Sequence, residues 1–189
     1  MNTKNIMIVG VGGQGSLLAS KALGCLLLSE GLDVKVSEVH GMSQRGGSVV
    51  TYVRYGPSVA SPVIDVGQAD YIVSFELLEA ARWLGYLAPD GLIVTNTQRI
   101  DPMPVITGAA GYPSELAAKL ASSGAKVDAF DALAPAERAG SSKAVNIVLL
   151  GRLSKYLEFA ETAWYGALDQ CVPARFIDMN REAFRLGRA

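Results

Sequence analysis

The first 29 residues contain an apolar run, a cluster of glycines and a longer apolar segment with helical spacing. Residues 6–9 are Ile, Met, Ile and Val, and residues 10–15 are Gly, Val, Gly, Gly, Gln and Gly. Leucine and alanine then recur every three or four positions as far as Leu27. This pattern predicts a buried strand, a tight turn and a buried helix, around which the rest of the chain is organised.

The later segments predict further strands and helices in alternation. Strands are expected at residues 34–39, 48–55, 71–75, 92–96 and 126–130, and helices at 77–86, 114–122, 134–138, about 142–157, 162–171 and 180–186. Ser114 is expected to cap one helix, and Ser141 or Ser142 another. Residues 97–112 contain several prolines and glycines, which predict a long surface connection.

The link between strands 34–39 and 48–55 decides the type of sheet. Residues 40–47 are polar and rich in glycine, and no crossover helix fits between the two strands, as a parallel pair would need. We therefore expect an α/β fold with a Rossmann-like, open, mixed and mostly parallel sheet flanked by helices, followed by a helical C-terminal segment. Because no linker or tandem repeat interrupts the chain, residues 1–189 are expected to form a single domain.

The composition argues against nucleic acid and membranes as partners, and it favours a cytoplasmic location. The formal net charge is −1 and charged residues make up 19% of the chain, so no basic face for nucleic acid is expected. No apolar run reaches membrane-spanning length, and the first five residues lack the pattern of a signal peptide, which favours a cytoplasmic protein away from membranes.

Cysteine and histidine, which commonly bind metals or act in nucleophilic catalysis, are scarce in this chain. Cys25 and Cys171 lie far apart in sequence in apolar surroundings, which suits buried, reduced thiols, and two thiols are too few for an iron–sulfur cluster. His40 is the only histidine and has no evident nucleophile to serve, so we expect neither a catalytic residue nor a metal site in this chain. Glu76 with Glu79, and Asp128 with Asp131, are interpreted as residues at a helix start and at strand ends.

The glycine turn is the first candidate site. Gly10 would permit the sharp turn, Gly12 would let the backbone approach a ligand, and Gly15 would let the helix pack against the strand. Together with Gly13 and Gln14, these residues would bind a phosphate group at the helix start. The alternatives are that the glycines serve packing alone and that Gln14 hydrogen-bonds only the turn.

The loop after the second strand is the other candidate site. Arg45 offers a fixed fork of donors, so it is counted with the glycine turn as a cofactor-binding residue. The rest of this loop is expected to line a substrate cleft or a subunit interface, and its members are His40, Met42, Ser43, Gln44, Gly46 and Gly47. Glu38, at the end of the preceding strand, stands where dinucleotide-binding domains place a ribose-binding acid, or it is an ordinary strand-end carboxylate.

Several motifs in shared order resemble the gamma-type domain of 2-oxoacid:ferredoxin oxidoreductases, and within that group the small beta subunits that act on indolepyruvate. They are residues 10–15, 41–50 and 75–80, together with 131–132, 143–151 and 180–184. The resemblance covers nearly the whole chain.

This resemblance implies a subunit of a hetero-oligomer that converts an aryl 2-oxoacid, coenzyme A and oxidised ferredoxin to an acyl-CoA, carbon dioxide and reduced ferredoxin. In such complexes thiamine diphosphate and the [4Fe–4S] clusters belong to a large alpha subunit, so this chain is expected to bind no cofactor alone and to be inactive alone. The glycine turn and Arg45 would then bind the phosphates of coenzyme A, the co-substrate.

Two other interpretations stay open from the sequence. A free-standing nicotinamide- or adenylate-binding protein would use the glycine turn and Glu38 as its adenosine site. A non-catalytic assembly subunit would use its glycines for packing and bind no small ligand.

Overall fold

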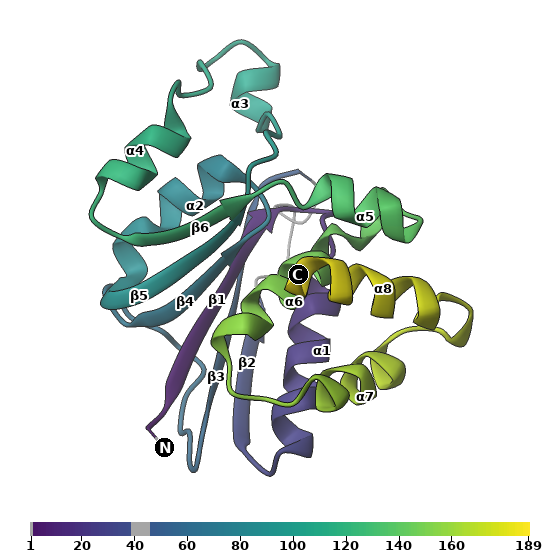
Figure 1. The fold of residues 1–189 in the computed structure, drawn as a ribbon. Helices are drawn as coiled ribbons and strands as arrows, with labels where there is room; N and C mark the ends of the chain where they lie inside the picture. The colour runs from purple at the N-terminus through teal and green to yellow at the C-terminus, as the bar shows by residue number, and fades with distance from the viewer. Residues whose placement is uncertain (1, 39–45) are drawn as a thin grey trace.

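The computed structural model describes residues 2–38 and 46–189 and has three layers, with a six-stranded sheet between two groups of helices (Figure 1). The strands are β1 (Lys4–Val11), β2 (Asp33–Glu38), β3 (Ser48–Gly56), β4 (Ala69–Ser74), β5 (Leu87–Asn96) and β6 (Lys126–Phe130). Their order across the sheet is β2-β3-β1-β4-β5-β6. Strands β1, β4, β5 and β6 are parallel, whereas β3 pairs antiparallel with both β1 and β2. The predicted mixed, mostly parallel sheet is confirmed.

Helices cover both faces of the sheet. The α-helices are α1 (Ser16–Ser29), α2 (Leu77–Trp83), α3 (Met103–Ile106), α4 (Leu116–Ser122), α5 (Leu133–Ala139), α6 (Val145–Leu153), α7 (Glu161–Cys171) and α8 (Ile177–Arg188). Short 3₁₀ turns cover Leu84–Tyr86, Ser142–Ala144, Ser154–Tyr156 and Ala174–Phe176. Helices α1, α5, α6, α7 and α8 lie together on one face, and α2 and α4 lie on the other (Figure 1).

Successive side chains of β1 contribute to two apolar cores, one on each face of the sheet. Ile6 and Ile8 belong to the core beneath α1 and α6, whereas Met7 and Val9 belong to the core beneath α2 and α4. Successive side chains of a strand point to opposite faces, so one continuous apolar run can serve both layers. The first strand has no polar alternation because it lies in the interior of the sheet and is covered by helices on both faces.

The predicted helix caps are wrong for one helix and right for another. Helix α4 begins at Leu116, and its N-cap residue is Glu115 with a positive φ of 58° and no side-chain cap, so the predicted cap at Ser114 is wrong. Ser141 does cap a helix, since its Oγ accepts a hydrogen bond from the Lys143 N–H at 3.2 Å. The long helix expected to reach residue 157 instead divides into a 3₁₀ turn, α6 and a second 3₁₀ turn. At its end, Ser154 Oγ donates to the Gly151 carbonyl at 2.6 Å.

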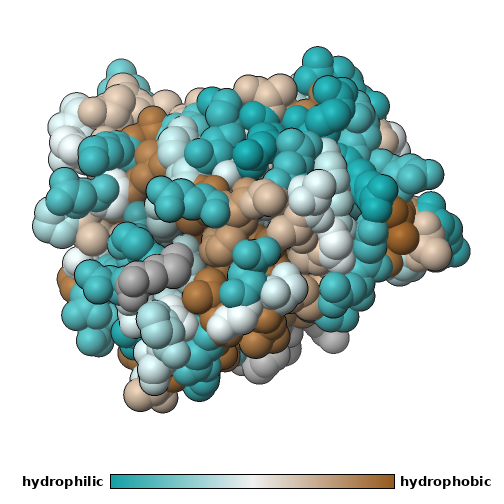
Figure 2. All heavy atoms as spheres, turned by 60° about the horizontal axis from the view of Figure 1, so that its bottom comes forward, coloured by the Kyte–Doolittle hydropathy of each residue, from teal (hydrophilic) through white to brown (hydrophobic). Residues whose placement is uncertain are grey.

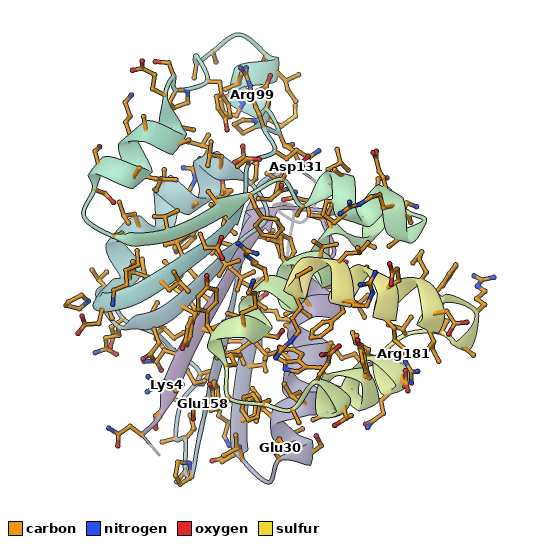
Figure 3. The ribbon with its side chains drawn as sticks, viewed as in Figure 1. Lys4, Glu30, Arg99, Asp131, Glu158 and Arg181 are labelled. Atoms are coloured by element: carbon orange, nitrogen blue, oxygen red, sulfur yellow. The ribbon has the colours of Figure 1, made fainter. Side chains whose placement is uncertain are left out.

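The amino ends of the parallel strands lie at the bottom of Figure 1, and Figure 2 brings this face forward. Apolar residues appear there between hydrophilic ones. Tyr55, Tyr71, Tyr156 and Phe159 line a cavity of about 670 Å³ at this end. Lys4, Glu30 and Glu158 are labelled at this end of the molecule in Figure 3. Within the described ranges no helix is long and apolar enough to cross a membrane.

Candidate functional site

The carboxyl ends of β1, β4, β5 and β6 meet at one edge of the sheet, where the glycine turn also lies. The register of β1 with β3 brings Val11 opposite Ser48, and the Gly12 N–H donates to the Gly47 carbonyl at 2.8 Å. The end of the second candidate loop is therefore attached to the glycine turn, as expected if both border one site. The other residues predicted from that loop, His40, Met42, Ser43, Gln44 and Arg45, lie outside the described residues.

The glycines of the turn have roles different from those assigned from the pattern. Gly13 and Gly15 have positive φ values of 98° and 85°, a conformation that favours glycine. Gly10 lies inside β1, where a Cβ atom would approach Gln14 Oε1 to 2.8 Å and Phe75 Cβ to 3.1 Å. The sharp turn is thus made at Gly13 and Gly15, and Gly10 provides room for packing, which corrects its predicted role.

Gly15 faces a second helix rather than the strand. A Cβ atom there would lie 2.6 Å from Nδ2 of Asn146, which donates to the Gly15 carbonyl at 3.1 Å. Asn146 is almost fully buried in α6, so the start of α1 is held by a helix far away in sequence. The predicted role of Gly15 in packing is right in kind, but its partner is α6.

Gln14 stabilises the turn with both ends of its amide. Its Oε1 accepts a hydrogen bond from the Val11 N–H at 2.7 Å, and its Nε2 donates to the Phe75 carbonyl at 3.1 Å. This arrangement ties the turn to the residue that follows β4. Of the two interpretations left open for Gln14, the structure shows the bond to the turn.

Several backbone N–H groups at the start of α1 have no hydrogen-bond acceptor among the described residues. Gly15 is the N-cap residue of α1, and no side chain caps the helix there. Within the described part of the chain, no acceptor is bonded to the N–H of Gly13, Gly15, Ser16 or Leu17. Such free donors at a helix start carry partial positive charge and suit an anion.

Two cavities flank this helix start. The first, of about 310 Å³, is lined by Gly12, Gly13, Gly15, Ser16, Leu17, Val49, Val50 and Thr51. The second, of about 410 Å³, is lined by Gly13, Gln14, Gly15, Gln98, Ile100, Ser142, Lys143 and Val145. Gly13 lies between the two, and a Cβ atom on it would meet nothing within 4 Å. Among the described residues, therefore, nothing closes the backbone of the turn on either side.

The second cavity contains polar residues that the sequence reasoning did not select as site residues. Lys143 lies on the 3₁₀ turn before α6, next to Ser142, and both side chains are exposed. Gln98 follows the end of β5. The available signal was a Ser-Ser-Lys sequence at a helix start after the last parallel strand, since that place also falls at the carboxyl edge of the sheet.

A different cation at this edge already has partners. Arg99 donates to both carboxylate oxygens of Asp101 at 2.6 and 3.2 Å, and its guanidinium lies 4.2 Å from the centre of the Tyr112 ring. Arg99 and Asp131 are labelled at this end of the molecule in Figure 3. Because two of its three guanidinium nitrogens are engaged by Asp101, Arg99 is less suited than Lys143 to bind a ligand phosphate.

Buried polar residues fix the connections around the edge. Glu76 is 1% exposed, caps α2 through the Glu79 N–H, and accepts hydrogen bonds from the Ile100 N–H and the Tyr112 hydroxyl. Burial, followed by this contact with Glu76, raises the pKa of Tyr112 well above its usual value. Asn96, fully buried, accepts from the Ala132 N–H at 3.1 Å. The interpretation of Glu76 as a helix-start residue is confirmed.

Asp131 follows β6 as predicted, whereas Asp128 lies in the middle of β6 rather than at its end, and both have structural partners. Asp128 binds Arg152 through two hydrogen bonds of 2.6 and 2.9 Å and accepts a third from the Tyr156 hydroxyl. Burial alone would raise the pKa of Asp128, but these hydrogen bonds outweigh it and hold the pKa below its usual range. Asp131 accepts from the Leu133 N–H at the start of α5. Within residues 2–38 and 46–189, no three His, Cys, Asp or Glu side chains form a group that could hold a metal ion.

Glu38 lies outside both cavities at the glycine turn. It ends β2, which is separated from β1 by β3, and its Oε1 accepts a hydrogen bond from Ser20 Oγ at 2.7 Å. In a dinucleotide-binding domain the strand with the ribose-binding acid is the direct neighbour of the strand that leads into the glycine turn. The interposed β3 therefore weighs against a ribose-binding role for Glu38.

Comparisons with known proteins place the chain in a family. The family model described as pyruvate ferredoxin/flavodoxin oxidoreductase matches residues 5–189. The indolepyruvate oxidoreductase subunit IorB of Thermococcus kodakarensis is 44% identical over 192 residues, which cover 99% of this chain and 95% of that protein.

Solved structures share the fold at lower identity. Pyruvate oxidoreductase subunit PORC from Thermotoga maritima matches with a TM-score of 0.73 at 21% identity, over 99% of this chain and 96% of that one. A 2-oxoglutarate:ferredoxin oxidoreductase from Magnetococcus marinus, solved with 2-oxoglutarate, coenzyme A and succinyl-CoA, matches with a TM-score of 0.72 at 18% identity. That match covers all of this chain and 31% of the other. From the family model and the near-full-length relative together, the chain belongs to the pyruvate ferredoxin/flavodoxin oxidoreductase family.

Proposed function

We propose that this chain is the small subunit of an indolepyruvate oxidoreductase. The observation that carries the proposal is the 44% identity to a subunit of that name over 99% of the chain. The reaction would convert an aryl 2-oxoacid, coenzyme A and oxidised ferredoxin to an acyl-CoA, carbon dioxide and reduced ferredoxin. The chain would act in the cytoplasm as part of a hetero-oligomer.

A large partner subunit would carry the redox and decarboxylation chemistry. Thiamine diphosphate and [4Fe–4S] clusters on that subunit would supply carbon–carbon bond cleavage and electron transfer. This chain has two cysteines, fewer than one such cluster needs. Its described carboxyl edge offers backbone N–H groups, hydroxyls and a lysine, which are groups suited to binding a phosphorylated substrate.

The role that we assign to this chain is to bind the phosphates of coenzyme A at the glycine turn. The N–H groups of Gly13, Gly15 and Ser16, which bond to no acceptor among the described residues, provide donors, and Lys143 provides a positive charge beside the same turn. The open space at Gly13 allows a phosphate to approach the backbone closely. Arg45 stays a predicted member of this site from its sequence position alone.

The geometry favours this role over the two alternatives. A nicotinamide site would need an acid near the turn, but Glu38 lies one strand farther away and is bonded to Ser20. A turn that serves packing alone would not need the two cavities that flank it or the lysine that lines one of them.

Reconstitution tests the proposed function. The chain would be produced alone and together with a candidate large subunit, and reduction of ferredoxin would be followed with indolepyruvate and coenzyme A. We expect a stable complex whose activity requires both subunits and both substrates, while the chain alone stays inactive. Activity of the chain alone, or full activity of the large subunit without it, would overturn the proposal.

A further inference from the structure

The two cysteines, far apart in sequence, meet where α7 packs against α1. Their sulfur atoms are 3.2 Å apart across a sequence separation of 146 residues. Both thiols are free and half-buried rather than fully buried as the sequence suggested. Figure 1 shows α7 beside the half of α1 that is farther from the glycine turn. The contact therefore joins the first helix of the chain to one of the last.

A surface cavity gives access to this pair. Cys25 lines a cavity of about 450 Å³ together with Ser20, Lys21, Gly24, Leu28, Val36 and Glu38. Leu28 and Val36 are 62% and 41% exposed, so the cavity opens between α1 and the edge strand β2. A small reagent can reach Cys25 from there without unfolding the protein.

We propose that Cys25 and Cys171 form a redox-active dithiol, a modification site that a small disulfide such as oxidised glutathione converts to an intramolecular disulfide. A disulfide has a sulfur–sulfur distance of about 2.05 Å, so the two atoms must approach by about 1.2 Å, within reach of side-chain rotation. The inference is independent of the proposed function.

The exchange proceeds in two balanced steps. Cys25 loses its proton and attacks one sulfur of the small disulfide, which forms a mixed disulfide and releases one small thiol. Cys171 then loses its proton and attacks Sγ of Cys25, which forms the protein disulfide and releases the second small thiol. The protein gives up two electrons and two protons, and the small disulfide takes up both.

The surroundings of the two thiols indicate which of them reacts first with the small disulfide. Burial, together with the contact to Cys25, raises the pKa of Cys171 to about 12, although the positive charge of Lys21 opposes this shift. Cys25 lines the cavity, whereas Cys171 does not. Cys25 is thus the thiol that reacts with the incoming disulfide, and Cys171 resolves the mixed disulfide because its sulfur is already in contact.

The disulfide would alter stability in a measurable way. It would close a loop of 146 residues and so restrict the unfolded chain. We expect the midpoint of thermal unfolding to rise by roughly 5–10 °C on oxidation. Reduction should reverse this rise completely.

The test uses the full-length protein incubated with oxidised glutathione and then with dithiothreitol. We expect the oxidised protein to lose both free thiols and two hydrogen atoms, to yield one cross-linked peptide pair containing Cys25 and Cys171, and to unfold at higher temperature. The matched variants Cys25→Ser and Cys171→Ser should show no intramolecular cross-link and no thermal shift. Cys171→Ser should instead accumulate a glutathione adduct on Cys25.

Three outcomes would overturn the inference. They are retention of both free thiols by the wild-type protein, a glutathione adduct without the internal cross-link, and a disulfide between two copies of the chain. The measurements on the wild-type protein suffice if either serine variant fails to fold.

Discussion

Glycine residues serve opposite purposes in two regions of this molecule, the glycine turn and the crossing of α6 with α8. At Gly13 in the turn, a Cβ atom would meet nothing within 4 Å. At Gly151 in α6 a Cβ atom would overlap the Phe184 carbonyl oxygen, and at Gly187 in α8 it would overlap the Val148 carbonyl oxygen. Gly13 keeps the backbone of the turn open, whereas Gly151 and Gly187 bring two helix backbones into contact.

The difference shows that glycine marks either an exposed backbone or a close packing, and that only the surroundings distinguish the two. At Gly13, a positive φ angle comes with open space, whereas Gly15 in the same turn packs against Asn146. In the α6–α8 crossing, both glycines have ordinary helical backbones within a buried apolar core. We therefore expect a substitution at Gly13 to change binding more than folding, and those in the crossing to change folding alone.

The largest expected effect is that of Gly187→Ala. The added methyl group must push α8 away from the Val148 carbonyl, which is backbone and cannot rotate aside. We expect the free energy of unfolding to fall by about 3 kcal/mol or more, measured by denaturation with urea.

Gly166→Ala is the matched control for this change. Gly166 also lies inside a helix, α7, but a Cβ atom there meets nothing within 4 Å. Alanine should raise the free energy of unfolding by up to about 1 kcal/mol through its higher helix propensity. If the two substitutions lower stability equally, close packing at Gly187 is not the reason for its glycine.

An intermediate effect is expected for Asp128→Asn, which weakens the ion pair between β6 and Arg152 of α6. The side chains of Asp128 and Arg152 are 13% and 26% exposed, so solvent screens the pair only partly. We expect the free energy of unfolding at pH 7 to fall by about 1–2 kcal/mol, because Asn keeps the shape but loses the charge.

The pH dependence of this difference follows from the lowered pKa of Asp128. A carboxyl group with a depressed pKa in the folded state stabilises the fold above its unfolded pKa, and this contribution is lost as the pH falls through the folded value. The difference between wild type and Asp128→Asn should stay constant from pH 7 to about pH 5 and shrink below about pH 4. A difference that grows on acidification would contradict the role of the ion pair.

The smallest effect on stability is expected for Gly13→Ala. The positive φ of 98° strains any L-residue, but the open space adds no clash. We expect a loss of about 1 kcal/mol in the free energy of unfolding, with the fold retained as judged by circular dichroism. A loss as large as that of Gly187→Ala would mean that the turn is a packed region after all.

Much of the fold could be predicted, because local sequence patterns indicate most of its strands and helices and the type of sheet. The apolar run before the glycine turn and the direct link between residues 34–39 and 48–55 were enough to indicate a mixed sheet. The position of β3 between β2 and β1 was not predicted, since strand order depends on pairings between distant segments. That residues 1–189 form a single domain stays a prediction.

Of the candidate site, only the glycine turn could be predicted from the sequence. A glycine pattern between a strand and a helix is visible in sequence, whereas Gly10 and Gly15 owe their roles to Phe75 and Asn146, which only folding brings near. In the same way, only folding brings Lys143 to the cavity that the turn also lines. Cys25 and Cys171 also meet only through the packing of α7 on α1.

The most direct test of the central claim is a calorimetric titration of the purified chain with coenzyme A, NAD and ATP, repeated on three variants. Gly12→Leu would block the turn and Lys143→Ala would remove the nearby charge, whereas Lys119→Ala removes an exposed lysine on α4 as the matched control. The account predicts that coenzyme A binds in preference to NAD, and that Gly12→Leu and Lys143→Ala each weaken its binding about tenfold or more while Lys119→Ala leaves it unchanged. Equal affinity for coenzyme A in all four proteins, with the fold of each verified, would contradict the account.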